Sequence, residues 1–207
     1  MPKRSTKRGV DERVRRSSSG EETRNALMDA ALEVLTERGV LAGLNLREVA
    51  DAVGVTPANI YHLFGSRQGL LRAALQRETS GLVEDVDAAR KLSFVDRRLQ
   101  MFDVIAAHPR LALTALLAID QDPEYQPLPF LLETRADYDQ RLAEDDIPLG
   151  IDIEAVHLLS LTVAIGMAVY GQSAARQVGV DVGELHDRMR TVFEAALRAM
   201  ISDFRAG

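Results

Sequence analysis

The chain has 207 residues, of which 46% are hydrophobic and 27% are charged. This composition is typical of a globular protein that buries a core in one or two domains, and it excludes a disordered chain. The absence of cysteine excludes a disulfide framework and thiolate metal sites. The first twenty residues lack the apolar segment of a signal peptide, so we expect a cytoplasmic protein.

The net charge of -6 is unevenly distributed along the chain. Residues 1–20 carry seven Lys or Arg and two Asp or Glu, whereas residues 79–207 carry 12 basic and 21 acidic residues. The basic, Ser-rich residues 1–20 are predicted to form a disordered arm that reaches DNA phosphates. The alternative is a solvated tail without a function, and the sequence leaves both interpretations open.

Ala and Leu recur at helical spacing, and no segment alternates like a strand, so the sequence predicts an all-α fold. The first apolar helix face covers residues 23–38 and ends before Gly39, which suits a left-handed C-terminal position. A second helix is expected over residues 46–53. Asn45 is placed to cap it, while Glu48 is placed to reach back to the Asn45 amide.

A third short helix follows a glycine turn. Gly54 allows the tight reversal, Thr56 is the expected N-cap, and Pro57 suits the first helical position. The helix should end near Phe64, and a fourth helix should open at Arg67. The expected core of this segment consists of Ala50, Val53, Val55, Ile60 and Phe64.

Two short helices joined by a glycine turn and braced by a longer helix form a helix-turn-helix. This motif places its second helix in the major groove of DNA, so the outward side chains of residues 56–62 should face DNA. Tyr61 and His62 are good donors to phosphate, and Arg67 lies at a helix N-terminus. Alone, His62 would be an ordinary surface histidine; its neighbours favour the DNA-facing role.

The segment TRNALMDAALEVLTERGVLAGLNLREVADAVGVTPANIYHLFGSRQGLLRAAL resembles the N-terminal DNA-binding domain of TetR-type (tetracycline-repressor-like) transcriptional regulators. The resemblance rests on the Ala-Ala pair and following Gly of the first helix, on LREVADAVGV, on IYHLF and on SRQGLL. Arg67 departs from the usual Lys, and Pro57-Ala58-Asn59 replaces a frequent Gly/Thr-containing segment, which leaves the base preference open. The predicted DNA-binding residues are Arg47, Thr56, Pro57, Ala58, Asn59, Tyr61, His62 and Arg67.

The resemblance divides the chain into a basic arm (1–20), a helix-turn-helix domain (21–66) and a helical ligand-binding and dimerisation domain (67–207). It implies a small-molecule effector for the last domain, which we expect to be hydrophobic or amphipathic. Eight residues are candidates for the lining of its binding site, although each could instead lie in the hydrophobic core or on the surface without contacting a ligand. These candidates are Met101, Phe102, His108, Tyr125, Phe130, Tyr138, His157 and Tyr170.

Residues 155–175 contain no Asp, Glu, Lys or Arg and are long enough to span a bilayer. Polar residues within the segment, the abundance of Ala and Gly and the lack of a basic flank favour a buried helix of a soluble protein instead, without a membrane partner. With residues 185–204, this helix is expected to build a four-helix interface of a homodimer. The predicted interface residues are Val163, Met167, Met189, Phe193, Leu197 and Met200.

No enzymatic signature is found, because the four histidines form no i, i+4 pair and neither a phosphate loop nor a nucleophile elbow occurs. We therefore expect no enzyme, no cofactor and no metal. The predicted function is a homodimeric repressor that binds a palindromic double-stranded DNA operator and is released by a small molecule. The alternatives are a ligand-independent architectural DNA-binding protein and an enzyme with a vestigial helix-turn-helix.

Overall fold

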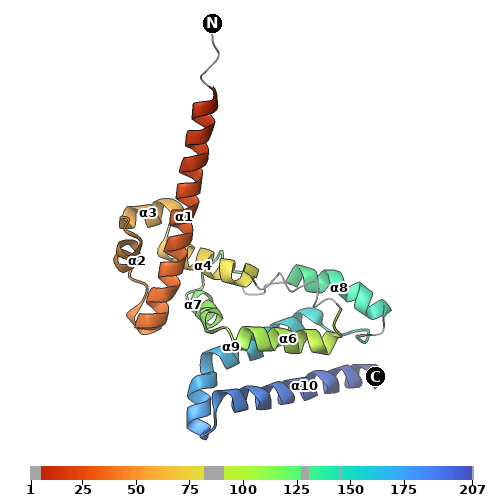
Figure 1. The fold of residues 1–207 in the computed structure, drawn as a ribbon. Coiled ribbons are helices and arrows are strands. Elements are labelled where there is room, and N and C mark those ends of the chain that lie inside the picture. Colours follow the sequence, from red (N-terminus) through yellow and green to blue (C-terminus); the bar gives the residue numbers. More distant parts are fainter. Residues whose placement is uncertain (1–5, 82–90, 127–130, 145, 207) are drawn as a thin grey trace. The chain divides into compact units, whose positions relative to one another are not determined.

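The computed structural model describes residues 6–81, 91–126, 131–144 and 146–206, and every regular element in these ranges is a helix (Figure 1). The predicted all-α fold is confirmed. The chain divides into two compact units, Met1–Arg77 and Glu78–Gly207.

The first unit contains α1 (Thr6–Arg38), the short 3-10 helix η1 (Val40–Ala42), α2 (Leu46–Val53), α3 (Pro57–Phe64) and most of α4 (Arg67–Gly81). The predicted ends of the second and third helices agree with the structure. The caps of these helices are formed by residues next to the helix ends, so the helix bounds could be predicted from the sequence.

The beginning of α1 differs from the prediction. The helix starts at Thr6, whereas the apolar pattern predicts a start at residue 23 and a disordered arm over residues 1–20. Residues 6–22 are mostly polar and carry no apolar face that would mark a helix. Once the following turns are formed, however, extending a helix costs little compared with nucleating one.

The first unit also reaches further along the chain than the predicted boundary at residue 66. Leu70 and Leu75 on α4 are buried. Arg77 donates to the carbonyl of Asn25 on α1 at 3.3 Å and pairs with Asp29 on the same helix. The first eleven residues of α4 therefore belong to the helix-turn-helix unit.

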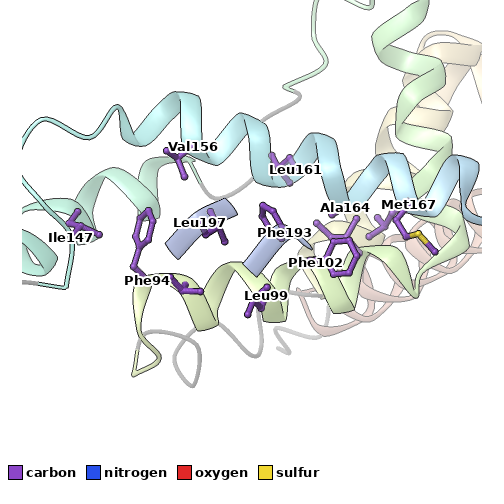
Figure 2. Close-up of a cluster of buried hydrophobic side chains, with 13 residues drawn as sticks. Phe94, Leu99, Phe102, Ile147, Val156, Leu161, Ala164, Met167, Phe193 and Leu197 are labelled. Carbon is purple, nitrogen blue, oxygen red and sulfur yellow. The ribbon is translucent and has the colours of Figure 1, made fainter. Parts of the chain in front are cut away.

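The second unit contains α6 (Phe94–Ala106), the 3-10 helix η3 (Pro109–Leu113), α7 (Thr114–Ile119), α8 (Leu131–Ala143), α9 (Ile153–Val178) and α10 (Val182–Ala206). The side chain of Asp152 caps α9 by accepting from the amides of Glu154 and Ala155 at 3.2 and 3.0 Å. The core lies between α6, α9 and α10 (Figure 2). Its members include Phe94, Leu99, Phe102, Val156, Leu161, Ala164, Met167, Phe193 and Leu197.

By length and composition, α9 is the one described helix that could cross a membrane without a bend. A core helix of a soluble protein passes the same test. In the structure, α9 contacts α6, α8, α10 and η3, and one side of it forms part of the core.

Candidate DNA-binding interface

The turn between α2 and α3 is built by one glycine and two buried side chains. Gly54 has φ +74°, and its N–H donates to the Asp51 carbonyl at 3.1 Å. Ala50 on α2 and Ile60 on α3 are fully buried. The left-handed conformation, which glycine adopts without strain, reverses the chain so that these two side chains share one core.

At the start of α2, the predicted cap by the Asn45 side chain is confirmed, whereas the predicted bond from Glu48 to the Asn45 amide is corrected. The Asn45 side chain accepts from the amides of Arg47 and Glu48 at 3.1 and 3.5 Å. Glu48, however, does not return to the Asn45 amide. It pairs with Arg38 at the end of α1 at 2.6 Å, because this arginine offers a charged partner.

One arc of α3 faces away from the core. Ala58, Asn59, Tyr61 and His62 are exposed and adjacent on the helix surface, opposite the buried Ile60. Tyr61 is 56% exposed. Of the other predicted DNA-binding residues, Pro57 is half-buried, and Arg47, Thr56 and Arg67 are exposed.

Asn59 has a structural role as well as an outward position. Its side-chain oxygen accepts from the Thr56 amide at 3.2 Å and from the Thr56 hydroxyl at 2.7 Å. The Asn59 oxygen therefore holds the first turn of α3. The NH2 of the same amide can only donate, so it matches acceptors on base edges.

Arg24 holds the other end of α3, and the sequence pattern did not single it out. Its guanidinium donates to the Leu63 carbonyl at 2.7 Å and lies 4.4 Å from the centroid of the Phe64 ring. The arginine thus satisfies a carbonyl at the C-terminus of α3 and covers its last aromatic side chain. Because the partner carbonyl is 39 residues away, no local motif could have revealed this contact.

The turn into α4 depends on the absence of a side chain at residue 69. The Ser66 hydroxyl accepts from the Gly69 amide at 2.9 Å and caps α4. A Cβ atom on Gly69 would overlap the carbonyl oxygen of Phe64. Gly69 therefore allows the last turn of α3 and the first turn of α4 to approach closely.

The candidate effector residues do not all lie together. Phe102 is fully buried in the core, and Met101 and Tyr138 pack against that core. His157 on α9 is buried with its Nδ1 atom 3.4 Å from the hydroxyl of Thr134 on α8.

Two further candidates lie at the edges of the second unit. His108 is partly exposed and lies 3.7 Å from the carboxylate of Glu78, with its Nδ1 atom buried and without a partner among the described residues. Tyr125 is half-buried, and burial raises the pKa of its hydroxyl, an effect that a hydrogen bond with Thr114 partly offsets.

Tyr170 and Phe130 do not join this group. Tyr170 is 69% exposed on the outer side of α9, so it lines no interior site of the single chain. Phe130 lies outside the described residues. The periodicity of an uncharged helix does not tell which side covers the core, and this explains the difference at Tyr170.

The residues predicted for the dimer interface face mainly the chain's own core. Phe193 is 4% exposed and Leu197 is 1% exposed, and Met167 is buried as well (Figure 2). These three side chains leave no surface for a partner, so this part of the prediction is corrected. The remaining three, Val163, Met189 and Met200, are partly buried against the same core.

The chain has a helix-turn-helix whose second helix presents an exposed arc, and a separate helical unit follows it. This arrangement is typical of the class of helix-turn-helix DNA-binding regulators. Comparison with known proteins narrows this class. Residues 27–74 match the family model for bacterial regulatory proteins of the tetR family. Over residues 27–74 the chain is therefore similar to the DNA-binding domain of TetR-family transcriptional regulators.

One relative is the HTH-type transcriptional regulator BetI of Rhizobium meliloti (strain 1021), which is 36% identical over 96 residues. The alignment covers 46% of this chain and 40% of that regulator's length. The chain therefore aligns with less than half of the length of that regulator.

Solved structures share the fold over most of the chain. Salmonella enterica GusR matches with a TM-score of 0.64 and 16% identity, covering 87% of this chain and 96% of that one. The regulator FadR from Bacillus subtilis, solved in complex with stearoyl-CoA, matches with a TM-score of 0.57 and 15% identity, covering 81% and 96%.

Proposed function

We propose that this chain is a ligand-responsive transcriptional repressor that works in the cytoplasm as a homodimer. The dimer binds a palindromic operator in double-stranded DNA, and a small molecule releases it. The observation that carries the proposal is the exposed arc of α3, which follows the helix-turn-helix turn at Gly54. The side chains of Tyr61 and His62 in this arc have no hydrogen bond or ion pair among the described residues.

Within this proposal the DNA-facing residues divide by chemistry. Tyr61 and Arg67 donate to backbone phosphates and fix the position of the protein on the duplex. Ala58, His62 and the NH2 group of Asn59 face base edges in the major groove, where the pattern of donors and acceptors identifies each base pair. Arg47, Thr56 and Pro57 form the edge of this surface.

The proposed dimer interface uses the sides of α9 and α10 that the single chain leaves exposed. We call this the apolar outer surface, and it contains Leu158, Leu159, Val169, Tyr170, Val192, Ala196 and Ala199. Val192 is 65% exposed, although its neighbour Phe193 is buried. An exposed apolar stripe of this extent marks a protein interface, and two helices from each subunit form a four-helix contact across a two-fold axis.

A dimer is also what specificity requires. A single helix-turn-helix contacts only a few base pairs, so two copies at a fixed separation are needed to select one site in a genome. The two-fold axis of the dimer predicts a palindrome whose half-sites lie about one helical turn, or a multiple of it, apart.

The effector is expected to bind in the second unit, where α6, α8 and α9 gather aromatic and polar side chains. The co-crystallised stearoyl-CoA of the FadR neighbour supports an amphipathic ligand for this fold. The ligand of this chain is thus proposed to be hydrophobic or amphipathic, as the composition of this unit suggests.

Selection of bound fragments from a genomic DNA pool tests the proposal. The full-length protein should enrich one palindromic sequence, and gel-shift titration should show saturable binding to it. Screening metabolites against the complex should find one that abolishes binding. Binding of equal strength to all fragments, unaffected by any metabolite, would support an architectural DNA-binding protein instead.

A further inference from the structure

Arg98 on α6 is a buried cation whose guanidinium has one unoccupied edge. The residue is 5% exposed. Its Nη1 atom donates to the Phe94 carbonyl at 3.2 Å, and its guanidinium carbon lies 3.4 Å from the centroid of the Phe94 ring. Its Nε atom is buried and has no partner among the described residues. Together with Nη2, this nitrogen forms the side of the guanidinium that fits the two oxygens of a carboxylate.

The nearby carboxylates are already bound by other arginines. Asp146 accepts from Nη1 of Arg141 at 2.5 Å. Asp137 pairs with Arg97 and lies 3.8 Å from Nη2 of Arg141. Among the described residues, three arginines therefore meet two aspartates in this cluster, which leaves one positive charge in excess there. Arg98 is the most deeply buried of the three arginines.

A guanidinium in this position is costly for the fold. Burial is the largest cause that lowers the pKa of Arg98, to about 9; the like charges of Arg97 and Arg141 lower it further, and the charge of Asp146 offsets part of this effect. A well-packed apolar side chain of similar volume is often neutral or stabilising in place of a buried charge. The fold alone therefore does not explain why an arginine occupies this position.

We infer that Arg98 is the anion-binding residue of the second unit and that it binds the carboxylate of an amphipathic small molecule. The inference rests on the proposed function for the role of this molecule as effector. A monoanion matches the single excess charge of the cluster, and its two oxygens match the Nε and Nη2 edge. The rest of the ligand should be apolar, because the guanidinium lies against the Phe94 ring and the side chains next to it on the buried side of α6 belong to the apolar core.

The test is direct binding to the full-length protein without DNA. The probes share a ten-carbon chain and differ in the head group: decanoate, decyl phosphate, decanol and decyltrimethylammonium. We expect decanoate to bind about tenfold or more tightly than the other three by calorimetry. We also expect it to shift the Nε–H signal of Arg98 in a nitrogen-correlated NMR spectrum, assigned by its loss in Arg98→Met.

Two variants separate ligand binding from folding. Arg98→Met should keep or raise the melting temperature while losing about tenfold or more of the decanoate affinity. Arg135→Met removes an exposed arginine of α8 that pairs with Glu154, and it should leave the decanoate affinity unchanged. Equal affinity for decanoate and decanol, or an Nε–H signal of Arg98 that does not move, would overturn the inference. If Arg98→Met fails to fold, Arg98→Lys, which keeps the charge but lacks the Nε–H group, assigns the signal in its place, so the NMR measurement on the unmodified protein still decides the question.

Failure of this inference is distinguishable from failure of the proposed function. If decanoate binds at Arg98 and the operator complex is unaffected, Arg98 is an anion-binding residue, but its ligand is not the effector that releases DNA. If a neutral or cationic metabolite releases the operator while decanoate does not bind, the regulator stands and the assignment of Arg98 is wrong.

Discussion

Tyr61 and Arg67 are exposed side chains with no hydrogen bond or ion pair among the described residues. The fold does not need either group. A change in DNA binding after their substitution can therefore be assigned to lost contacts with DNA and not to a damaged domain.

We predict that Tyr61→Phe and Arg67→Ala each weaken binding to all DNA sequences by a similar factor, because phosphate contacts carry no sequence information. Arg67→Ala should also lower the slope of log affinity against log salt by about one. Gel-shift or fluorescence anisotropy titrations on operator and random DNA at several salt concentrations measure both effects.

The matched control is Arg188→Ala, which removes an exposed arginine of α10 that pairs with Glu184. This variant should keep the affinity and the salt slope. An Arg67→Ala protein that retained full affinity but preferred another sequence would show that Arg67 reads bases.

Arg24 is predicted to stabilise the C-terminal end of α3, the helix that carries the candidate DNA-binding surface. Arg24→Ala should lower the free energy of unfolding by about 1 to 2 kcal/mol, since a partly buried charged hydrogen bond and a cation–π contact are lost together. Arg24→Lys should recover part of this loss because it keeps the charge but not the planar group. Urea unfolding followed by circular dichroism measures the difference, and equal stability of the alanine variant and the parent would contradict it.

At the residue scale, local contacts could be predicted and distant ones could not. Asn45, Gly54 and Pro57 act over one to three neighbouring residues, so their type and spacing reveal their roles. Arg24 and Glu48 find their partners through the tertiary fold. Nothing in the spacing of the sequence marks those pairs.

At the scale of elements, the connection between α3 and α4 is the most sensitive point of the first unit. We predict that Gly69→Ala destabilises this unit by about 1 to 3 kcal/mol, because the new methyl group meets the rigid backbone of Phe64. The control is Gly20→Ala in α1, where a Cβ meets no atom within 4 Å. That variant should gain about 0.5 to 1 kcal/mol from helix propensity. Thermal unfolding of the two proteins should therefore show shifts of opposite sign, and two shifts of the same sign would be evidence against the close approach.

The N-terminal segment gives a second prediction for an element. Deletion of residues 1–20 removes seven basic and two acidic residues. It should reduce DNA affinity at low salt, and the loss should shrink as salt rises, because counterion release drives this contribution. The fold should survive the deletion. Equal affinities of the two proteins at low salt would show that the segment has no role in binding.

The helices themselves were predictable to different degrees. α2 and α3 have clear caps, so their bounds follow from the sequence. Residues 155–175 of α9 carry no charge and are apolar nearly all round, so their periodicity did not separate the core side from the exposed side. The adjacent residues Leu158 and Leu159 are both exposed. Only the position of neighbouring helices decides this, and that information is not local.

At the scale of the whole molecule, the adjacent residues Val192 and Phe193 on α10 separate assembly from folding. We predict that Val192→Glu gives a folded monomer with operator binding lost, because a charge is introduced twice at a two-fold contact. Phe193→Glu should instead unfold the second unit, because it buries a charge in the core of each subunit. Light scattering measures the mass, and circular dichroism measures the helix content. A Val192→Glu protein that remains a dimer and binds its operator would remove this side of α10 from the interface.

The double task of Asn59 limits how this regulator could be engineered to recognise a different operator. Its oxygen accepts from Thr56 and holds the first turn of α3, and its NH2 group is proposed to face base edges, so most replacements would alter DNA preference and helix stability together. Ala58 and His62 carry no such bond among the described residues. A mutagenesis library aimed at new target sequences should therefore randomise positions 58 and 62 freely. At position 59 it should admit only Asp, Ser and Thr besides Asn, since these side chains can still accept from Thr56.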